Sequence, residues 1–326
     1  MRRRTFCRQA LGGALALPLV APRLLAAGGA AGAAKPGFFA RHQLPIGVQL
    51  YTLGPELAND LPGMLAALRQ MGCETVETAD LLGRTPAEFR AALDVAGLRC
   101  TSMHIAGMPL GPGPGLSLSG DLAALAAAAH TLGATDIVMP IFLFPQDFKP
   151  PATSDMLALL AGAGAALTAD DYRRMADFLN EKARLLKAEG LRLAYHNHNP
   201  EFRPLPGGAT GYELLLRHTD RRLVGFEMDA GWVSAAGRDP LQLLRAWPGR
   251  FTAMHVKDIK GSTTTNYEFR QVPTEVGAGI INWPQILPVA LAQGVKQFYV
   301  EQEPPFPGPR IDSVGKSVRY LQRLPA

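Results

Sequence analysis

Short apolar runs that end in polar residues alternate with helical stretches eight times along the chain. Each run has the length of a buried strand, and the stretches between them carry apolar residues at helical spacing. Glycine stands just before several of the runs, where it would end the preceding helix. The expected strands cover residues 46–52, 74–79, 99–105, 136–142, 191–197, 223–229, 251–257 and 296–302.

A helix is expected after each strand, and the alternation indicates a parallel sheet. Eight such units predict an α/β fold of the (β/α)8 TIM-barrel type, as a single domain over residues 37–326. Segments 107–120 and 144–168 are expected to be long loops within it. The expected helices cover 61–71, 86–96, 122–132, 169–189, 212–217, 240–246, 283–293 and 312–324.

The first 30 residues have the pattern of an export signal. Arg3 and Arg4 precede Phe6, and an apolar run follows that ends in small residues near Ala30. A basic head, a short apolar middle and a small-residue exit predict a twin-arginine signal peptide. The run is too short and too rich in Gly and Pro for a spanning helix. We therefore expect a periplasmic or secreted protein, exported by the twin-arginine machinery, without stable membrane insertion.

Charge and cysteine content narrow the function classes. The chain has 33 Lys+Arg against 28 Asp+Glu, and five of the basic residues but no acidic ones lie in the first 30 residues. The rest is balanced at 28 against 28, so no basic surface for nucleic acid is expected. Cys73 and Cys100 are expected to be a buried thiol pair, with a disulfide as the alternative.

Strand parity brings polar residues to one end of the predicted barrel. Alternate residues of a barrel strand point inward, and active sites lie at the carboxyl ends of the strands. Where apolar neighbours face the helices, the polar residues between them must face the interior. The carboxyl mouth is then expected to hold Gln49, Tyr51, Glu77, His104, His196, Asp229, His255, Lys257 and Glu301.

Four of these residues end four consecutive strands and predict a metal site. His196, Asp229, His255 and Glu301 supply two imidazoles and two carboxylates, which are costly to bury unless paired or bound to metal. This donor set suits one divalent ion, Mn²⁺ first, with Co²⁺, Zn²⁺ or Fe²⁺ as alternatives. A metal-free network of ion pairs is the competing interpretation.

At these residues the chain resembles the xylose isomerase-like TIM barrels, a family of sugar phosphate isomerases and epimerases. The resemblance covers nearly the whole chain after the signal. It is densest at Tyr195-His196-Asn197-His198, in the exported branch that carries this signature, and around Glu227-Met228-Asp229, His255-Val256-Lys257 and Glu301. The family's ketose epimerases use Glu, Asp, His and Glu as metal ligands. His196 departs from that pattern at the first position, which favours the branch that handles 3-oxo-sugars and 3-oxo-glycosides.

The resemblance implies an isomerase, epimerase or related lyase that acts through an enediolate on a non-phosphorylated sugar. Glu301, His104 or Glu77 would shuttle the proton, and Lys257 would stabilise the developing oxyanion. Trp232 would offer an aromatic face to the sugar or pack in a loop. The remaining expected substrate contacts are Gln49, Tyr51, His198 and Glu201, the last two with an alternative role in orienting His196.

Two other classes stay open at this point. A non-catalytic exported sugar-binding barrel would keep the fold without turnover. An abasic-site endonuclease-like phosphodiesterase would need a three-metal cluster and a basic surface, which the balanced charge disfavours. The resemblance also allows a homo-oligomer.

Overall fold

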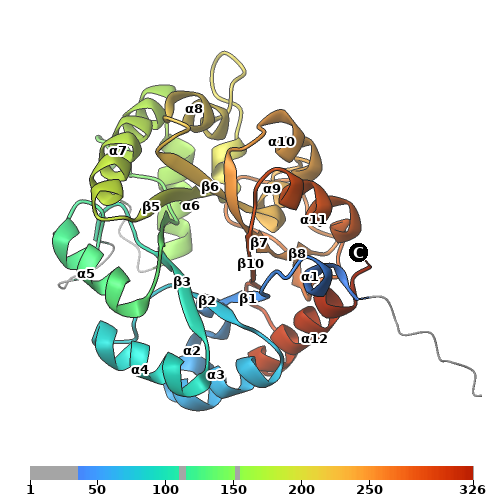
Figure 1. The fold of residues 1–326 in the computed structure, drawn as a ribbon. Helices are drawn as coiled ribbons and strands as arrows, with labels where there is room; N and C mark the ends of the chain where they lie inside the picture. The colour runs from blue at the N-terminus through green and yellow to red at the C-terminus, as the bar shows by residue number, and fades with distance from the viewer. Residues whose placement is uncertain (1–35, 110–114, 151–154, 326) are drawn as a thin grey trace, which may run out of the picture. The chain divides into compact units, whose positions relative to one another are not determined.

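Eight parallel strands close into a barrel in the computed structural model, which describes residues 36–109, 115–150 and 155–325 (Figure 1). The strands follow one another around the barrel in chain order, and β10 closes it against β1. Described residues from 36 onward form one compact unit. The barrel strands are β1 (Gly47–Gln49), β2 (Thr75–Thr78), β3 (Arg99–His104), β4 (Asp136–Met139), β5 (Arg192–His196), β6 (Val224–Asp229), β7 (Phe251–Val256) and β10 (Gln297–Val300).

Helices surround this barrel (Figure 1), and the outward-facing side chains of the strands belong to the apolar core between strands and helices. The helical elements are α1 (Phe38–Arg41), η1 (Leu50–Leu53), α2 (Gly54–Asn59), α3 (Leu61–Gln70), α4 (Pro86–Ala96), α5 (Leu122–Leu132), α6 (Met156–Ala166), α7 (Ala169–Ala188), η2 (Pro200–Phe202), α8 (Gly211–His218), α9 (Ala230–Ala235), α10 (Pro240–Ala246), α11 (Trp283–Ala292) and α12 (Arg310–Arg323). A short antiparallel pair, β8 (Asp258–Ile259) and β9 (Pro273–Thr274), lies beyond β7. None of the described helices combines the length and apolar character that a membrane span requires.

The helix starts are specified locally. Thr85, Thr168 and Thr210 each form a reciprocal capping box with the acidic residue three positions later. These contacts satisfy backbone N–H groups that a first helical turn leaves without partners. The beginnings of α4, α7 and α8 therefore follow from residues next to them in sequence.

The pattern of alternating faces is confirmed in the strands. Phe226 and Met228 pack outward in the apolar core, and Glu227 and Asp229 are as fully buried on the other side. The pairing register shifts between Val76 and Glu77 on β2 and between Phe226 and Glu227 on β6. Such irregularities re-aim side chains next to functional sites. Both precede a glutamate that points into the barrel.

Several expectations needed correction. The segment 144–168 was expected to be a loop, but it contains α6, which begins after Asp155 accepts hydrogen bonds from the N–H groups of Leu157 and Ala158. Tyr51 was placed in the first strand, but that strand ends at Gln49, and Tyr51 lies in η1. The predicted signal peptide lies outside the described residues. Cys73 and Cys100 are free and buried, so the disulfide alternative is wrong.

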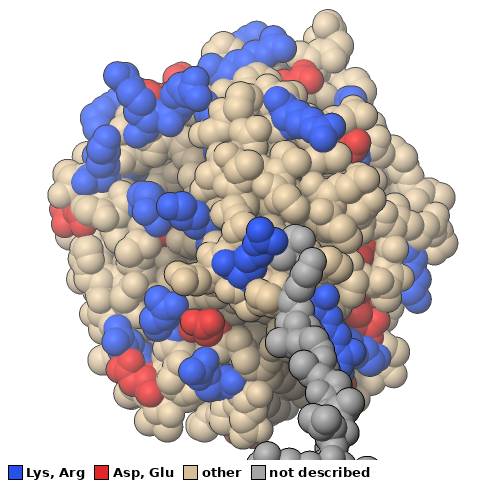
Figure 2. All heavy atoms as spheres, turned by 45° about the vertical axis from the view of Figure 1, so that its right-hand side comes forward, with Lys and Arg blue, Asp and Glu red and all other residues tan. Residues whose placement is uncertain are grey.

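Charged side chains on the face drawn in Figure 2 do not form one continuous basic stripe. Lys and Arg lie there in separate groups, several of them next to Asp or Glu. This face therefore lacks the continuous positive surface that tracks a nucleic-acid backbone.

Asp258, directly after the His255-Val256-Lys257 segment, holds together the loops at this end of β7. Its carboxylate is fully buried and accepts hydrogen bonds from the N–H groups of Gly277 and Ile281 and from the Trp283 indole, at 2.9, 3.2 and 3.0 Å. Hydrogen bonds to a buried charge are among the stronger ones in proteins. Asp258 is therefore a structural residue.

We expect Asp258→Ala to lower the free energy of unfolding by about 2–4 kcal/mol, because the N–H groups of Gly277 and Ile281 and the Trp283 indole lose their acceptor. Urea denaturation followed by circular dichroism measures the loss. Asp94→Ala is the control, since the exposed Arg90–Asp94 pair should contribute less than about 1 kcal/mol. Equal stability of the two variants would contradict the role of Asp258.

Candidate active site

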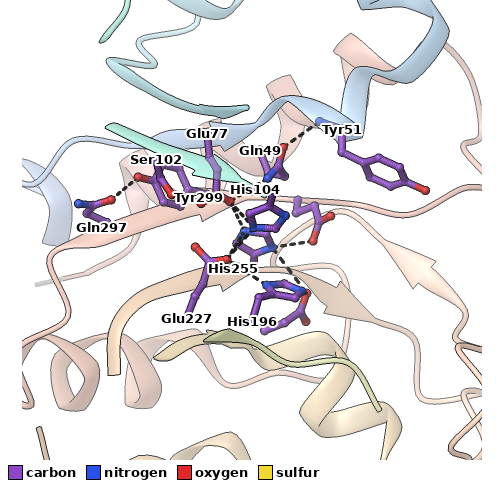
Figure 3. A network of polar contacts seen from close by, with 12 residues as sticks. Gln49, Tyr51, Glu77, Ser102, His104, His196, Glu227, His255, Gln297 and Tyr299 are labelled. Carbon is purple, nitrogen blue, oxygen red and sulfur yellow. Dashed lines mark hydrogen bonds and ion pairs between the residues drawn. The ribbon is translucent and has the colours of Figure 1, made fainter. Parts of the chain in front are cut away.

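A buried polar network fills the carboxyl end of the barrel (Figure 3). Its side chains come from β1, β2, β3, β5, β6 and β7 and from the residues that follow β7 and β10, so the barrel itself sets their positions. His104 and Glu303 lie at the edge, with side chains 10% and 17% exposed, and the other members are buried. The network comprises Gln49, Glu77, His104, His196, Glu227, Asp229, His255, Lys257, Glu301 and Glu303.

The inner half joins two glutamates through imidazoles. Glu227 Oε2 lies 3.0 Å from His104 Nε2, 3.0 Å from His196 Nδ1 and 3.1 Å from His255 Nε2. Glu77 Oε1 lies 2.9 Å from His104 Nε2 and 2.7 Å from His255 Nε2. We call Glu77, His104, Glu227 and His255, together with His196, the inner group.

Glu77 is held in place from behind. Gln49 Nε2 donates to Glu77 Oε1 at 2.8 Å, and the Ser102 hydroxyl donates to Oε2. Gln49 in turn accepts a hydrogen bond from the N–H of Tyr51. These contacts fix the carboxylate plane of Glu77 toward His104 and His255.

The outer half is arranged around an ammonium group. Lys257 Nζ lies 2.9 Å from Asp229 Oδ2, 2.7 Å from Glu301 Oε2 and 3.2 Å from Glu303 Oε1. Glu301 Oε2 also lies 2.8 Å from His255 Nδ1. We call Asp229, Lys257, Glu301 and Glu303 the outer group. His255 joins the two groups, one through each ring nitrogen.

The two groups shift several pKa values. Burial opposes charge on His104, but the neighbouring Glu77 and Glu227 carboxylates prevail and raise its pKa to about 9. Burial raises the pKa of Asp229 to about 7, although Lys257 acts against it. Lys257 itself loses solvation, yet Asp229 and Glu301 raise its pKa well above the usual range. Burial and nearby cations lower the pKa of His196 well below its ordinary value.

The four ligands predicted from the sequence fall into different parts of the network. Asp229, His255 and Glu301 converge, with ligand atoms within 4.8 Å of one another. His196 Nδ1 faces Glu227 in the inner group, and its Nε2 is 3.9 Å from Asp229 Oδ2. A second convergent set consists of His104, His196, Glu227 and His255. The donors are mixed nitrogen and oxygen, the chemistry that first-row divalent metals accept.

The residues predicted to contact substrate are spread more widely. Tyr51 is 47% exposed, and the Glu303 carboxylate beside it raises its pKa to about 12. Trp232 is only 3% exposed, with Lys257 Nζ 5.0 Å from its ring centre, so its face is covered. Half-buried His198 packs against Trp232 and Phe269.

Glu201 lies away from the network, inside the wall of the barrel. It accepts hydrogen bonds from the Tyr195 hydroxyl at 2.6 Å and from the N–H of His198 at 3.2 Å. Burial raises its pKa to about 7. These contacts position the backbone of His198. The alternative that the sequence left open, a role of Glu201 in orienting His196, stays a prediction.

Three contributors were outside the predicted site. From the sequence, Glu227 was expected to pair with Lys257 or to orient a ligand, with a role as a ligand as the alternative; in the structure it contacts three imidazoles. Glu303 could have been found from its spacing, two residues beyond Glu301. Phe269 reaches His198 because Asn199 Nδ2 donates to the backbone of Asn266 and Asn199 Oδ1 accepts from Phe269 N–H, contacts that no sequence pattern signals.

A cavity of about 930 Å³ adjoins the network beside His104. The segments after β2 and β3 line it, together with α4 and α5, and Asp80, Arg84 and Leu116 are among the lining residues. His104 is the member of the network that reaches it. The volume is in the range of small-molecule sites.

The model of the xylose isomerase-like TIM barrel matches residues 65–324. This chain belongs to the xylose isomerase-like TIM barrel family. The resemblance inferred from the sequence is thereby confirmed.

The curated relatives that match this chain in sequence are inosose dehydratases. An inosose dehydratase of Bacillus cereus is 26% identical over 170 residues, which are 48% of this chain and 55% of that protein. The chain thus spans about half the length of the curated relatives it matches.

Solved structures match over more of the chain. A sugar phosphate isomerase/epimerase from Parabacteroides distasonis is 25% identical, with a TM-score of 0.67 over 86% of this chain and 94% of its own. The apo 3-keto-D-glucoside 4-epimerase of E. coli has 16% identity and a TM-score of 0.57, over 85% of this chain and 98% of its own, and shares the fold.

The pKa shifts predict how the stability of the metal-free protein depends on pH. Between about pH 6.5 and 9 the native state keeps protons on His104 and His255 that the unfolded chain has lost, because their native pKa values are raised. Stability should therefore fall as pH rises through this window. Urea denaturation in EDTA measures it, and His104→Gln should flatten the slope. A profile that rises across the window would contradict the protonated network.

Proposed function

We propose that this protein is a metal-dependent enzyme that moves a proton at the carbon next to a carbonyl group of a non-phosphorylated sugar, 3-oxo-sugar or 3-oxo-glycoside. The product of that step is an enediolate, which isomerisation, epimerisation and elimination share. The observation that carries the proposal is the buried network of imidazoles and carboxylates at the mouth of a barrel of this family.

The charge of the network supports a bound cation. The carboxylates of Glu77, Glu227, Asp229, Glu301 and Glu303 stand against one ammonium, Lys257, and the imidazoles of His104, His196 and His255. Even with all three imidazoles charged, four positive groups face five negative ones. A buried excess of negative charge is costly, and a divalent ion offsets it. When bound, such an ion would polarise a substrate carbonyl.

The residues of this chain divide the remaining work. Of the three acid–base candidates, only Glu301 lies beside Lys257, at 2.7 Å. Glu301 is therefore assigned the proton transfer, and Lys257 the stabilisation of negative charge on the substrate oxygen. Glu77 and His104 belong to the inner group: Glu77 contacts Nε2 of His255, and the His104 ring stacks on the His255 ring.

The substrate class rests on the relatives and on the cavity. Names such as inosose dehydratase and sugar phosphate isomerase/epimerase describe polyhydroxylated carbonyl compounds or their reactions. The cavity beside His104 contains Arg84 among its described lining residues, but no group of basic residues that would mark a phosphate site. We accordingly propose a substrate without phosphate. The predicted twin-arginine signal supports a reaction outside the cytoplasm.

Exchange of a substrate proton with solvent tests the reaction directly. In D₂O, proton NMR should show loss of the signal of the hydrogen next to the carbonyl for a member of a panel of 3-oxo-glycosides, inososes and ketoses. Glu301→Gln should slow the exchange by roughly 100-fold or more, because it removes the proton acceptor. Asp94→Asn on the surface is the control and should exchange at the wild-type rate.

The same experiment separates the alternatives. Exchange at the wild-type rate in Glu301→Gln would contradict the assigned proton shuttle. Binding of these compounds without exchange or turnover, in protein loaded with metal, would favour the non-catalytic sugar-binding barrel.

A further inference from the structure

The cavity beside His104 extends from the polar network to one face of helix α5. His104 belongs to both the network and the cavity lining, and Ala124, Ala127 and Thr131 line the cavity from α5. Their spacing puts these three residues on one side of the helix. Seven residues of α-helix rise about 10 Å, so the cavity follows α5 for roughly that length.

The cavity is larger than one sugar ring requires. Its volume of about 930 Å³ lies near the upper end of the roughly 300–1,000 Å³ that is usual for pockets enclosing drug-sized ligands. A single sugar ring is smaller than such ligands. A sugar bound at the network would therefore leave most of the cavity empty.

Aliphatic side chains form most of the cavity lining. Leu81 follows β2 and Leu116 precedes α5, and both pack against the apolar core. Met103 and Ile105 line the cavity from β3 and the residue after it, and Ala128 does so from α5. All three are buried. An apolar ligand would lose its contact with water here, which favours binding.

The polar side chains of the lining have partners in their own segments. Asp80 Oδ1 accepts a hydrogen bond from Leu82 N–H at 2.6 Å, and Arg84 Nη1 donates to the Leu82 carbonyl at 3.3 Å. Thr85 belongs to the capping box of α4, and the Thr131 hydroxyl donates to a carbonyl of its own helix at 2.8 Å. The cavity thus offers few partners for sugar hydroxyls, which are costly to bury without hydrogen bonds.

The two sides of His104 therefore suit different parts of one molecule. The network side holds carboxylates, imidazoles and an ammonium, whereas the cavity side is mainly aliphatic. We propose that this cavity binds the apolar aglycone of a glycoside whose sugar lies at the network. This inference rests on the proposed function and narrows its substrate class to 3-oxo-glycosides with an aglycone such as a phenyl group. Free sugars and inososes carry no group that would fill the cavity.

Wild-type protein gives the first test, which does not depend on any variant folding. The probe is 4-bromophenyl glucoside, which lacks the 3-oxo group and is not consumed by the proposed reaction. Soaked crystals should show an anomalous bromine peak between α5 and the segment that follows β2. A bromine peak at the rim beside Tyr51 would overturn the proposal, and so would the absence of a peak at a saturating concentration of the probe.

The second test compares the affinities of phenyl and methyl glucosides, measured by calorimetry for both anomers. Wild-type protein should bind the phenyl glucoside of one anomer roughly 10-fold or more tightly than the methyl glucoside, because the cavity removes the aromatic ring from water. Equal affinities of the phenyl and methyl compounds would overturn the proposal.

Matched variants on α5 show whether the cavity causes this preference. Ala123 and Ala127 are both exposed, but of the two only Ala127 lines the cavity. Ala127→Phe should abolish the preference for the phenyl glucoside, because the new ring fills the space. Ala123→Phe makes the same exchange one turn earlier and should keep the wild-type preference. A preference that survives in both variants, or is lost in both, would contradict the assignment.

These measurements separate the inference from the proposed function. Affinity and the bromine position report the cavity without any turnover, whereas proton exchange in D₂O reports the reaction. A phenyl preference without exchange on any 3-oxo-glycoside would support the cavity assignment and count against the proposed function. Exchange with the same kcat/KM for methyl and phenyl 3-oxo-glucosides would support the function and overturn the aglycone site.

Discussion

Five carboxylates, buried or nearly so, at one end of a closed barrel are the constraint on which the rest of this structure depends. Glu77, Glu227 and Asp229 are fully buried, Glu301 nearly so, and the Glu303 side chain is 17% exposed. Charges in such surroundings must be paired. The structure meets this need with Lys257, which contacts three of the carboxylates, and with three imidazoles placed on β3, β5 and β7. Register shifts before Glu77 and Glu227 adjust the strands to these contacts.

His255 divides this network because its two ring nitrogens point to different carboxylates. Nδ1 faces Glu301 and Asp229, whereas Nε2 faces Glu77 and Glu227. The two sides of the His255 ring therefore differ in the positive charges that face them. Lys257, fully buried in the outer group, is the strongest of these charges.

Much of this could be predicted from the sequence, since strand parity depends only on alternation. The apolar residues beside them predict which polar side chains face the barrel interior: Gln49, Glu77, His104, His255 and Glu301. The glycines that end the helices predict the order of helices and strands. Contacts between side chains could not be predicted in the same way. Whether Glu227 turns to Lys257 or to three imidazoles depends on a register shift in β6. Phe269 approaches His198 because its backbone N–H donates to Asn199, a contact between distant parts of the chain. The Ala-rich composition of α6 did not distinguish a helix from a loop.

His196 stands at a strand end where the resemblance implies a glutamate, and it gives the two groups their different characters. A glutamate at this strand end would add a sixth buried carboxylate next to Asp229, which lies 3.9 Å from His196 Nε2. An imidazole adds no negative charge, so the ammonium of Lys257 has only the carboxylates of the outer group to offset. Nδ1 of the same ring turns to Glu227 at 3.0 Å and adds a third nitrogen to the inner group. A histidine at position 196 thus adds no carboxylate beside Lys257. It places a third imidazole next to Glu227 in the inner group, which Lys257 does not contact.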